Sequence, residues 1–357
     1  MKIGQMETRF VTGGMKRVGR GALAACLAGS LALVPFAAVA SDHRIALVPG
    51  GPHPYFAGWE PGVADAARDF GIAKVAYQVP AEWKLETQTQ LLESLAAQGT
   101  NAFGIFPGDA VGINSTLGEL KAGGLPSIAI AGCAKDPTAA AFCFSTDVFQ
   151  AAYVGTKALI AAMGGKGAIV HVAGLLVDPN TTLREQAVTK AVEETKGAVT
   201  LLQTVGDTDN QERGDQKINA LLAAQKDKIG GIIATAYISS VVTATALRNL
   251  GDKRIKMVGI DDDKIVLNGI RDGFVAGTIA QNPYGQAYIG AYALDLLAGG
   301  CTVKADAPWI TTPLTTHFID SGTVVISTNN VGSYAEDLKA LTKKMQANFK
   351  DTYLTCK

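Results

Sequence analysis

The feature that most constrains the fold of this chain is a regular alternation of short apolar segments with longer amphipathic ones. Buried strands are predicted at 44–49, 74–79, 102–106, 127–131, 167–172, 199–205, 230–234, 255–260 and 278–280. Helices are predicted between them at 56–70, 87–98, 148–163, 182–195, 211–225 and 239–249. Strands that alternate with helices of about 10–15 residues indicate parallel sheets built from right-handed crossovers.

The number of strands indicates more than one sheet. The chain has 357 residues, which suits one large or two medium domains. About ten strands exceed the usual size of a single sheet. The sequence therefore predicts an α/β fold with two doubly wound parallel-sheet lobes. A last helix is predicted at about 334–349, before a polar tail.

Several functional classes are disfavoured. The formal net charge is zero, whereas nucleic-acid binding needs concentrated Lys and Arg. The chain has no G-x-S-x-G, HExxH or GxxxxGK[ST] motif, so we expect neither an enzyme nor a cofactor. The run Asp261-Asp262-Asp263 is compatible with a metal cluster. However, consecutive residues on one turn point in different directions, so a helix cap with solvated charges is favoured and no metal is expected.

The first forty residues have the pattern of a secretory signal. Lys16, Arg17 and Arg20 precede an apolar run, 22–39, that ends in Ala38-Val39-Ala40. We expect cleavage after Ala40 and export to the periplasm. A membrane anchor needs about 20 strongly apolar residues, whereas this run is rich in alanine and broken by Pro35. Lipid attachment at Cys26 is disfavoured because few apolar residues precede it, and Met15 is an alternative start.

Export would place four cysteines in an oxidising compartment. Three pairings are possible, and local spacing favours Cys133–Cys143 together with Cys301–Cys356. The second of these bonds would hold the C-terminal tail against the body of the protein. Four free thiols are the alternative.

Ligands of open parallel sheets bind beyond the carboxyl ends of the strands. The residues that follow the predicted strands, or begin the next helix, are His53, Tyr55, Phe56, Trp59, Asp109, Arg184, Ala236, Tyr237, Asp261 and Gln281. Rings can stack on the C–H faces of a sugar, and carboxylates, amides and guanidinium groups bind its hydroxyls. Each residue also has an ordinary structural role, such as a core ring or a helix N-cap. Their joint placement predicts a hydroxylated small molecule.

Three stretches near the C-terminus carry a specific resemblance. They are Val258-Gly259-Ile260-Asp261, Asn268-Gly269-Ile270-Arg271-Asp272-Gly273, and Gly277 to Tyr284. Together with Ser145-Thr146-Asp147, they resemble the periplasmic sugar-binding proteins of ABC importers, the type I (ribose-binding-like) family. The resemblance covers nearly all of 41–330.

This resemblance implies two lobes joined by a three-segment hinge, with crossings near 144, 281 and 314. The implied division is 41–144 plus 282–314 for the N-terminal lobe, 145–281 plus 315–333 for the C-terminal lobe, and 334–357 for a C-terminal helix and tail. It also implies a cleft lined by the residues matching His53, Tyr55, Phe56, Arg184, Asp261 and Gln281. Asp109, in Pro107-Gly108-Asp109, matches the ligand carboxylate of the family.

The chain departs from the family at two of these positions. His53 stands where many members have Asn. After Ile233, many members place an Asn-Asp pair where this chain has Ala236-Tyr237, so an amide is lost and a ring is gained. The departure points to a smaller, reshaped or less polar ligand.

The implied function is that of a monomeric binding protein that captures a sugar or polyol and delivers it to an ABC permease in the inner membrane. The alternative is a receptor of the same fold that senses a sugar-like signal, such as an autoinducer, for a membrane kinase. Neighbouring genes would separate the two functions. A repressor of related fold is disfavoured, because a secretory segment stands where its DNA-binding helices would lie.

Overall fold

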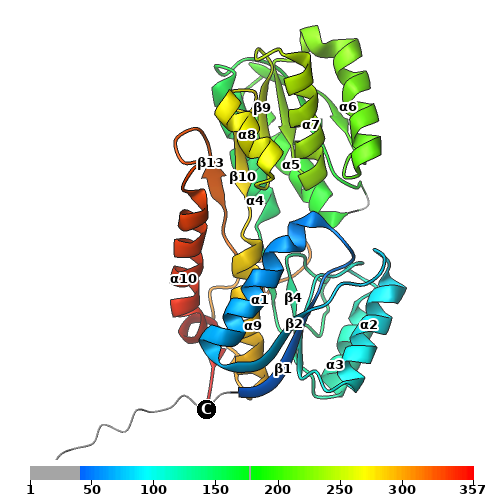
Figure 1. Cartoon of the computed structure of the whole chain (residues 1–357), viewed down its shortest axis with the longest axis vertical. Coiled ribbons are helices and arrows are strands. Elements are labelled where there is room, and N and C mark those ends of the chain that lie inside the picture. Colours follow the sequence, from blue (N-terminus) through cyan, green and yellow to red (C-terminus); the bar gives the residue numbers. More distant parts are fainter. Residues whose placement is uncertain (1–40, 177) are drawn as a thin grey trace, which may run out of the picture. The chain divides into compact units, whose positions relative to one another are not determined.

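Two six-stranded sheets flanked by helices form the frame of the protein (Figure 1). The computed structural model describes residues 41–357 with the exception of 177, so the predicted signal segment, with Met15, Cys26 and Ala40, lies outside the described residues. All strand pairs of the two sheets are parallel except the one between β10 (Gly277–Ala280) and β13 (Val324–Ile326). The predicted α/β fold with two doubly wound lobes is confirmed.

The first sheet forms the N-terminal lobe, with strand order β12-β5-β4-β3-β1-β2. Its strands are β1 (Ser41–Val48), β2 (Ile72–Tyr77), β3 (Ala102–Ile105), β4 (Ser127–Ile130), β5 (Cys143–Ser145) and β12 (Phe318–Asp320). Its helices are α1 (Trp59–Phe70), α2 (Leu85–Ala97), α3 (Asn114–Ala122) and α9 (Pro283–Ala298). In β1, Ile45 and Leu47 pack with α1 and α9, whereas Ala46 and Val48 pack with α2 and α3.

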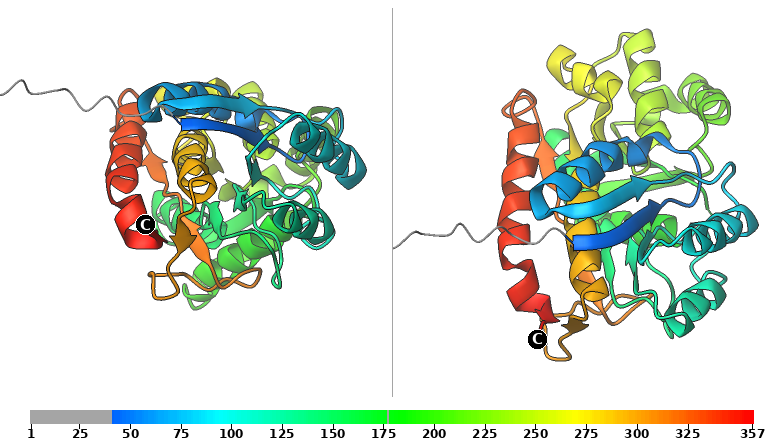
Figure 2. Two further views of the ribbon diagram at one scale, coloured as in Figure 1. Left: turned by 90° about the horizontal axis from the view of Figure 1, so that it is seen from below. Right: turned by 60° about the horizontal axis from the view of Figure 1, so that its bottom comes forward.

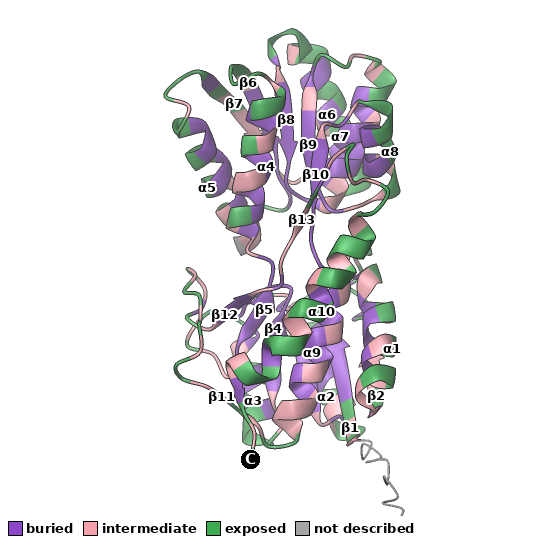
Figure 3. Ribbon diagram, turned by 90° about the vertical axis from the view of Figure 1, so that its left-hand side faces the viewer, coloured by how far each residue is buried: buried purple, intermediate pink, exposed green. Residues whose placement is uncertain are grey.

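The second sheet forms the C-terminal lobe, with strand order β13-β10-β9-β8-β6-β7. Its remaining strands are β6 (Gly167–Val172), β7 (Val199–Val205), β8 (Gly231–Ala234) and β9 (Lys256–Ile260). Its helices are α4 (Val148–Ala162), α5 (Pro179–Glu193), α6 (Gln211–Gln225), α7 (Tyr237–Leu250) and α8 (Lys264–Asp272). Burial on both faces explains why the inner strands β8, β9 and β10 are apolar along most of their length, whereas the edge strands β7 and β13 are partly exposed (Figure 3).

The connections between the two sheets differ from the prediction at one point. The chain passes between them at 146–147, 281–282 and 321–323, where no strand or helix is formed. The predicted crossing near 314 is wrong, because β12 pairs in parallel with β5 of the first sheet. Phe318 and Ile319 are buried there, so 315–320 belongs with the N-terminal lobe rather than with the C-terminal one.

The C-terminal helix α10 (Tyr334–Tyr353) adds a fourth connection between the lobes. At its start, Tyr334 and Leu338 pack against the core of the C-terminal lobe. In its middle, buried Thr342 hydrogen-bonds with Asn282 of the second crossing, at 3.0 Å from the amide nitrogen. At its end, Phe349 lies in the core of the N-terminal lobe. Figures 1 and 2 show α10, in red, running beside α9.

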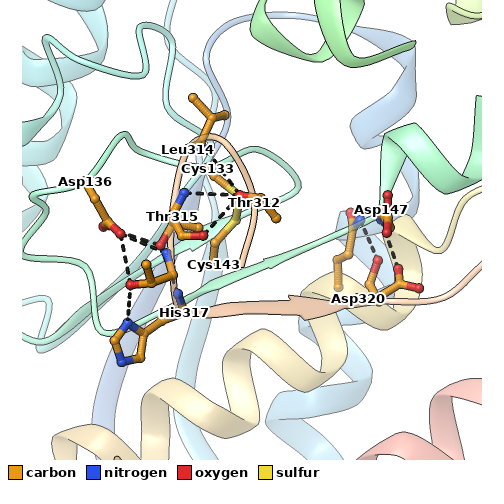
Figure 4. The surroundings of a disulfide bond; sticks show 12 residues. Cys133, Asp136, Cys143, Asp147, Thr312, Leu314, Thr315, His317 and Asp320 are labelled. Carbon is orange, nitrogen blue, oxygen red and sulfur yellow. Dashed lines mark hydrogen bonds between the residues drawn. A yellow bond between two sulfur atoms is a disulfide. The ribbon is translucent and has the colours of Figure 1, made fainter. Parts of the chain in front are cut away.

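Both disulfides occur in the predicted pairing. Cys301–Cys356 holds the chain end, where β14 (Leu354–Thr355) pairs with β11 (Thr302–Val303). Cys133–Cys143 joins the segment that follows β4 to the first residue of β5 (Figure 4). In that segment the Asp136 carboxylate accepts hydrogen bonds from the Thr316 backbone N–H and hydroxyl, at 2.8 and 3.2 Å.

Several short elements were not predicted. They are α3, β5, β12 and β13, together with a 3-10 helix, Pro54–Gly58, that takes up the start of the helix predicted at 56–70. Each is too short to show a clear hydrophobic period. None of the helices in the described part of the chain is both long and apolar enough to cross a membrane.

Candidate ligand-binding site

A cavity opens where the carboxyl ends of strands from both sheets face each other. It has two adjoining chambers. The one of about 660 Å³ is bordered by exposed residues such as Val111 and is called the outer chamber, and the one of about 70 Å³, whose own lining is mostly buried, is called the inner chamber. Eight residues line both chambers: His53, Trp83, Phe106, Asp178, Asn180, Arg184, Asp209 and Ala236. The inner chamber is completed by Tyr55, Phe56, Ala131, Tyr237, Asp261 and Gln281.

The N-terminal lobe contributes a cluster of aromatic rings. Phe106 lies edge-to-face with Phe56 and with Trp83, at centroid distances of 5.4 Å in both cases. Trp83 approaches the loop after β1 so closely that a Cβ on Gly51 would lie 2.7 Å from the Trp83 Cα. Glycine at this position therefore allows Trp83, which is 40% exposed, to reach the cavity.

Two polar residues of the same lobe are held by the 3-10 helix. His53 is its N-cap, and the imidazole Nδ1 accepts a hydrogen bond from the Tyr55 N–H at 3.2 Å. The Tyr55 hydroxyl donates to Gln286 Oε1 at 2.8 Å, and burial is the main cause that raises the pKa of Tyr55. Tyr55 is thus a neutral, fixed part of the wall. The other nitrogen of His53, Nε2, faces the opposite lobe.

Arg184 is the one cation of α5 that enters the cavity, and it is only 8% exposed. Among the described residues it makes no ion pair and no hydrogen bond, and its Nε is buried without a partner. Beneath it, buried His171 lies 2.7 Å from the Thr235 hydroxyl through Nε2. Burial, with the Arg184 charge adding to it, lowers the pKa of His171 to about 3, so His171 is neutral. A buried guanidinium without a partner is costly unless a ligand supplies acceptors.

Two carboxylates near Arg184 also serve as helix caps. Asp178 is the N-cap of α5 and accepts from the Asn180 N–H at 2.9 Å. Burial raises the pKa of Asp178, although the charge of Arg184 opposes that effect. Asp209 accepts from the Ile238 N–H at 3.0 Å, in the first turn of α7.

Asp209 also faces the N-terminal lobe. Its Oδ2 lies 3.4 Å from His53 Nε2, and the ring of Tyr237 lies 5.9 Å from that of His53. Burial acts to raise the pKa of Asp209, but the nearby His53 imidazole, with the Ile238 N–H and Arg184, lowers it overall. The lobes therefore meet around the inner chamber.

Asp261 follows β9 and is 5% exposed. It has a φ of +66°, in the left-handed region that aspartate tolerates better than most residues. Its Oδ1 accepts a hydrogen bond from Gln281 Nε2 at 2.8 Å. Burial raises the pKa of Asp261 to about 7, against the lowering effects of Gln281 and Arg184. The carboxyl can therefore exchange a proton near neutral pH.

The other predicted residues of the C-terminal lobe lie at the start of α7. Ala236 is buried, lines both chambers, and as N-cap provides no side-chain hydrogen bond, a role that Asp209 takes over. The Tyr237 hydroxyl donates to Asp263 Oδ2 at 2.9 Å. Within the described residues, no group of acidic, His or Cys side chains is arranged to hold a metal ion, so Asp261 to Asp263 form no such cluster.

Two predicted ligand residues lie elsewhere than expected. Trp59 is 0% exposed and lines neither chamber, because it points from the start of α1 into the core between Phe56 and Tyr77. Asp109 lies at the outer chamber only, and its Oδ1 accepts from the N–H groups of Val111 and Gly112 at 2.9 and 2.7 Å. Its carboxylate is thus partly engaged as the cap of a turn.

The cavity residues that escaped prediction include Trp83, Phe106, Asp178, Asn180 and Asp209. Phe106 and Asp209 follow β3 and β7, so they could have been predicted by considering every residue within about four positions of a strand end. Asp178 and Asn180 have the pattern of an ordinary helix start. Trp83 lies in a loop whose path has no local sequence signal.

Comparison with known proteins shows which proteins this chain is similar to. A family model described as "Periplasmic binding protein domain" matches residues 45–301. A xylitol-binding protein from Mycolicibacterium smegmatis is 25% identical over 239 residues, which are 66% of this chain and 67% of that protein.

Solved structures share the fold at low identity. An ABC transporter solute-binding protein from Burkholderia graminis, in complex with D-arabinose, matches with a TM-score of 0.71 at 21% identity, over 83% of this chain and 98% of that one. One from Agrobacterium vitis, bound with α-D-tagatopyranose, matches with a TM-score of 0.70 at 22% identity, over 82% and 97%.

Proposed function

Because the chain belongs to the periplasmic binding protein family, we propose that it captures a sugar or polyol in the cavity between its lobes and delivers it to an ABC permease. The observation that carries this proposal is Arg184, a buried guanidinium without a partner, facing three carboxylates and a wall of rings. The hydroxyls of a sugar can accept from Arg184 and donate to Asp178, Asp209 and Asp261.

Neutral hydroxylated ligands suit the charge of this cavity. Three acidic groups and one guanidinium leave no surplus of positive charge for an anionic solute. The rings of Phe56, Trp83 and Phe106 offer the apolar contacts that C–H groups of a sugar require. The relatives whose names and complexes mention xylitol, D-arabinose and tagatopyranose support pentoses, ketohexoses and pentitols as the first candidates.

Capture requires contacts with both lobes. A ligand favours the closed arrangement only through contacts that it makes better there. The rings of the N-terminal lobe and the ionic groups of the C-terminal lobe would supply such contacts from opposite sides. The closed protein would then dock on the permease. A receptor for a membrane kinase could use the same capture step, and no feature of the cavity favours it over import.

The proposal includes export of a monomer to the periplasm by a signal segment cleaved after Ala40, and it includes no catalytic step. Mass spectrometry of the protein secreted to the periplasm would give Ser41 as the first residue. A mature protein that begins elsewhere, or that retains residues 1–40, would contradict this part of the proposal.

The test of capture is a thermal-shift screen of the mature protein, followed by calorimetry. The panel contains xylitol, D-arabinitol, D-arabinose, D-xylose, D-tagatose and D-fucose, with L-leucine and citrate as controls. A true ligand at 100 times its Kd stabilises the protein by about 2.7 kcal/mol. If the amino acid or the anion stabilises the protein and no sugar or polyol does, the proposed ligand class is wrong.

A further inference from the structure

The two chambers of the cavity differ in chemistry. The inner chamber is lined by Arg184, carboxylates, amides and rings. Most of the side chains found only in the outer chamber are apolar, including Pro52, Pro107, Val111, Cys133, Leu175 and Leu314. The polar side chains found only there are Asp109, which caps a turn, and Thr181, which is 2% exposed. Arg184, Asp178, Asn180 and Asp209 border both chambers, but the part of the outer chamber that lies away from them offers few partners for hydroxyl groups.

Apolar side chains stand exposed on both sides of the outer chamber. Val111, from the N-terminal lobe, is 62% exposed, and Leu175, from the C-terminal lobe, is 38% exposed. Their exposure leaves apolar surface in contact with water, which a bound apolar group would remove.

Another part of the wall of the outer chamber is held in place by a disulfide and by hydrogen bonds. Leu314 packs against the Cys133–Cys143 disulfide, and its carbonyl accepts from the Asp136 N–H at 2.8 Å (Figure 4). The Asp136 carboxylate in turn holds the Thr316 N–H at 2.8 Å. A surface fixed in this way is suited to packing against a rigid or bulky group.

The sizes of the chambers limit where a ligand can fit. The outer chamber, about 660 Å³, is much larger than the inner chamber, about 70 Å³, so a ligand that fills both has the smaller part of its volume in the inner chamber. The lobes already meet there, with His53 and Asp209 3.4 Å apart. The outer chamber is about 660 Å³ in volume, within the range of about 300–1,000 Å³ typical of small-molecule sites.

We propose that the natural ligand is a sugar or polyol derivative with an apolar substituent, whose hydroxylated part binds in the inner chamber and whose substituent packs on Val111, Leu175 and Leu314. This inference rests on the proposed function. Ala236, where many family members have a polar residue, lines both chambers and so extends the apolar surface from the outer chamber towards the inner one.

The test compares the tightest parent ligand of the panel with its n-butyl and phenyl derivatives. Both anomers of the glycoside are used for a sugar, and the terminal O-butyl and O-phenyl ethers for a polyol. Calorimetry on the mature protein measures each Kd and its temperature dependence. At least one derivative should bind ten-fold or more tightly than the parent, a difference of about 1.4 kcal/mol. Its ΔCp of binding should be more negative, since more apolar surface is buried.

A pair of variants locates the effect. Val111→Asp should reduce the ratio of parent Kd to derivative Kd towards one, because a carboxylate then borders the substituent. The matched control is Leu202→Asp, since Leu202 is 39% exposed in the C-terminal lobe and lines neither chamber. The control should keep the full ratio.

The outcomes separate this inference from the proposed function. If a parent sugar binds and none of its derivatives binds more tightly, the inference is overturned and sugar capture stands. If a derivative binds more tightly but Val111→Asp keeps the full ratio, the substituent lies elsewhere and the inference is again overturned. If neither parents nor derivatives bind, the proposed function itself fails.

Discussion

The two lobes have the same architecture but contribute different chemistry to the cavity. The N-terminal lobe supplies the rings of Phe56, Trp83 and Phe106, and both disulfides lie in it. The C-terminal lobe supplies Arg184 and the carboxylates of Asp178, Asp209 and Asp261, and its described residues contain no disulfide. We infer that the N-terminal lobe selects mainly the shape of the ligand and the C-terminal lobe mainly its hydroxyl groups.

The largest expected effect concerns the stability of the N-terminal lobe. Cys301–Cys356 joins residues 55 apart, and Cys133–Cys143 residues 10 apart. Because longer closed loops restrict the unfolded chain more, loss of the first bond should cost about 4 kcal/mol and loss of the second about 3 kcal/mol. Urea unfolding of the two Cys→Ser double variants measures both. If both variants unfold at the same urea concentration as wild type, the disulfides do not stabilise the N-terminal lobe.

A second prediction concerns the pH dependence contributed by the C-terminal lobe. The pKa of Asp261 is about 7 in the folded protein and near 3.8 in the unfolded chain. Its contribution to stability is full below pH 4 and is lost as pH rises to 7, because only the unfolded state releases the proton in that range. Relative to wild type, Asp261→Asn should thus gain stability between pH 4.5 and 7.5, on the order of a few kcal/mol.

Unfolding at both pH values, in the absence of ligand, measures this difference. Asp252→Asn, at an exposed ion pair of the same lobe, is the control and should show no such gain. If the difference between Asp261→Asn and wild type does not change with pH, Asp261 is not the buried acid described above.

A third prediction addresses the ionic side of the cavity. Arg184→Ala should weaken ligand binding by about 1.5–3 kcal/mol, the range for hydrogen bonds to charged groups. Arg213→Ala, at an exposed position of α6, is the matched control and should bind as wild type. Unchanged affinity of Arg184→Ala in calorimetry would remove the guanidinium from the binding site.

The smallest effect separates two tryptophans of the N-terminal lobe. Trp83→Ala should weaken binding by about 0.5–1.5 kcal/mol, because a ring beside the ligand is removed. Trp59→Phe should lower the free energy of unfolding but leave affinity unchanged, since Trp59 lines neither chamber. The reverse pattern would restore Trp59 to the ligand set.

The sequence was sufficient to predict the architecture, because the periodicity of apolar residues can be followed along the whole chain. It was insufficient where only a few residues determine the path of the chain. The crossing near 314 was wrong because β12 has only three residues. A C-terminal helix was predicted where α10 lies. Its return to the N-terminal lobe was not, because it depends on contacts of Thr342 and Phe349 with residues far away in the sequence.

The candidate site shows the same division. Strand ends and the family resemblance identified Phe56, Arg184, Asp261 and Gln281, which all line the inner chamber. Asp178 was missed because a carboxylate at a helix N-cap has an ordinary local role. Trp59 was misplaced because a residue in the first turn of a helix can face either the cavity or the core, and only tertiary packing decides.

The central claim is that one ligand contacts rings from the N-terminal lobe and Arg184 from the C-terminal lobe at the same time. Trp83 reports on it directly in a Trp59→Phe, Trp309→Phe protein, where it is the sole tryptophan. Titration with the tightest ligand should change the Trp83 emission saturably, with a Kd equal to the calorimetric one, and Arg184→Ala should shift that curve to at least ten-fold higher ligand. Calorimetric binding with no response from Trp83, or a response that Arg184→Ala leaves in place, would contradict the claim.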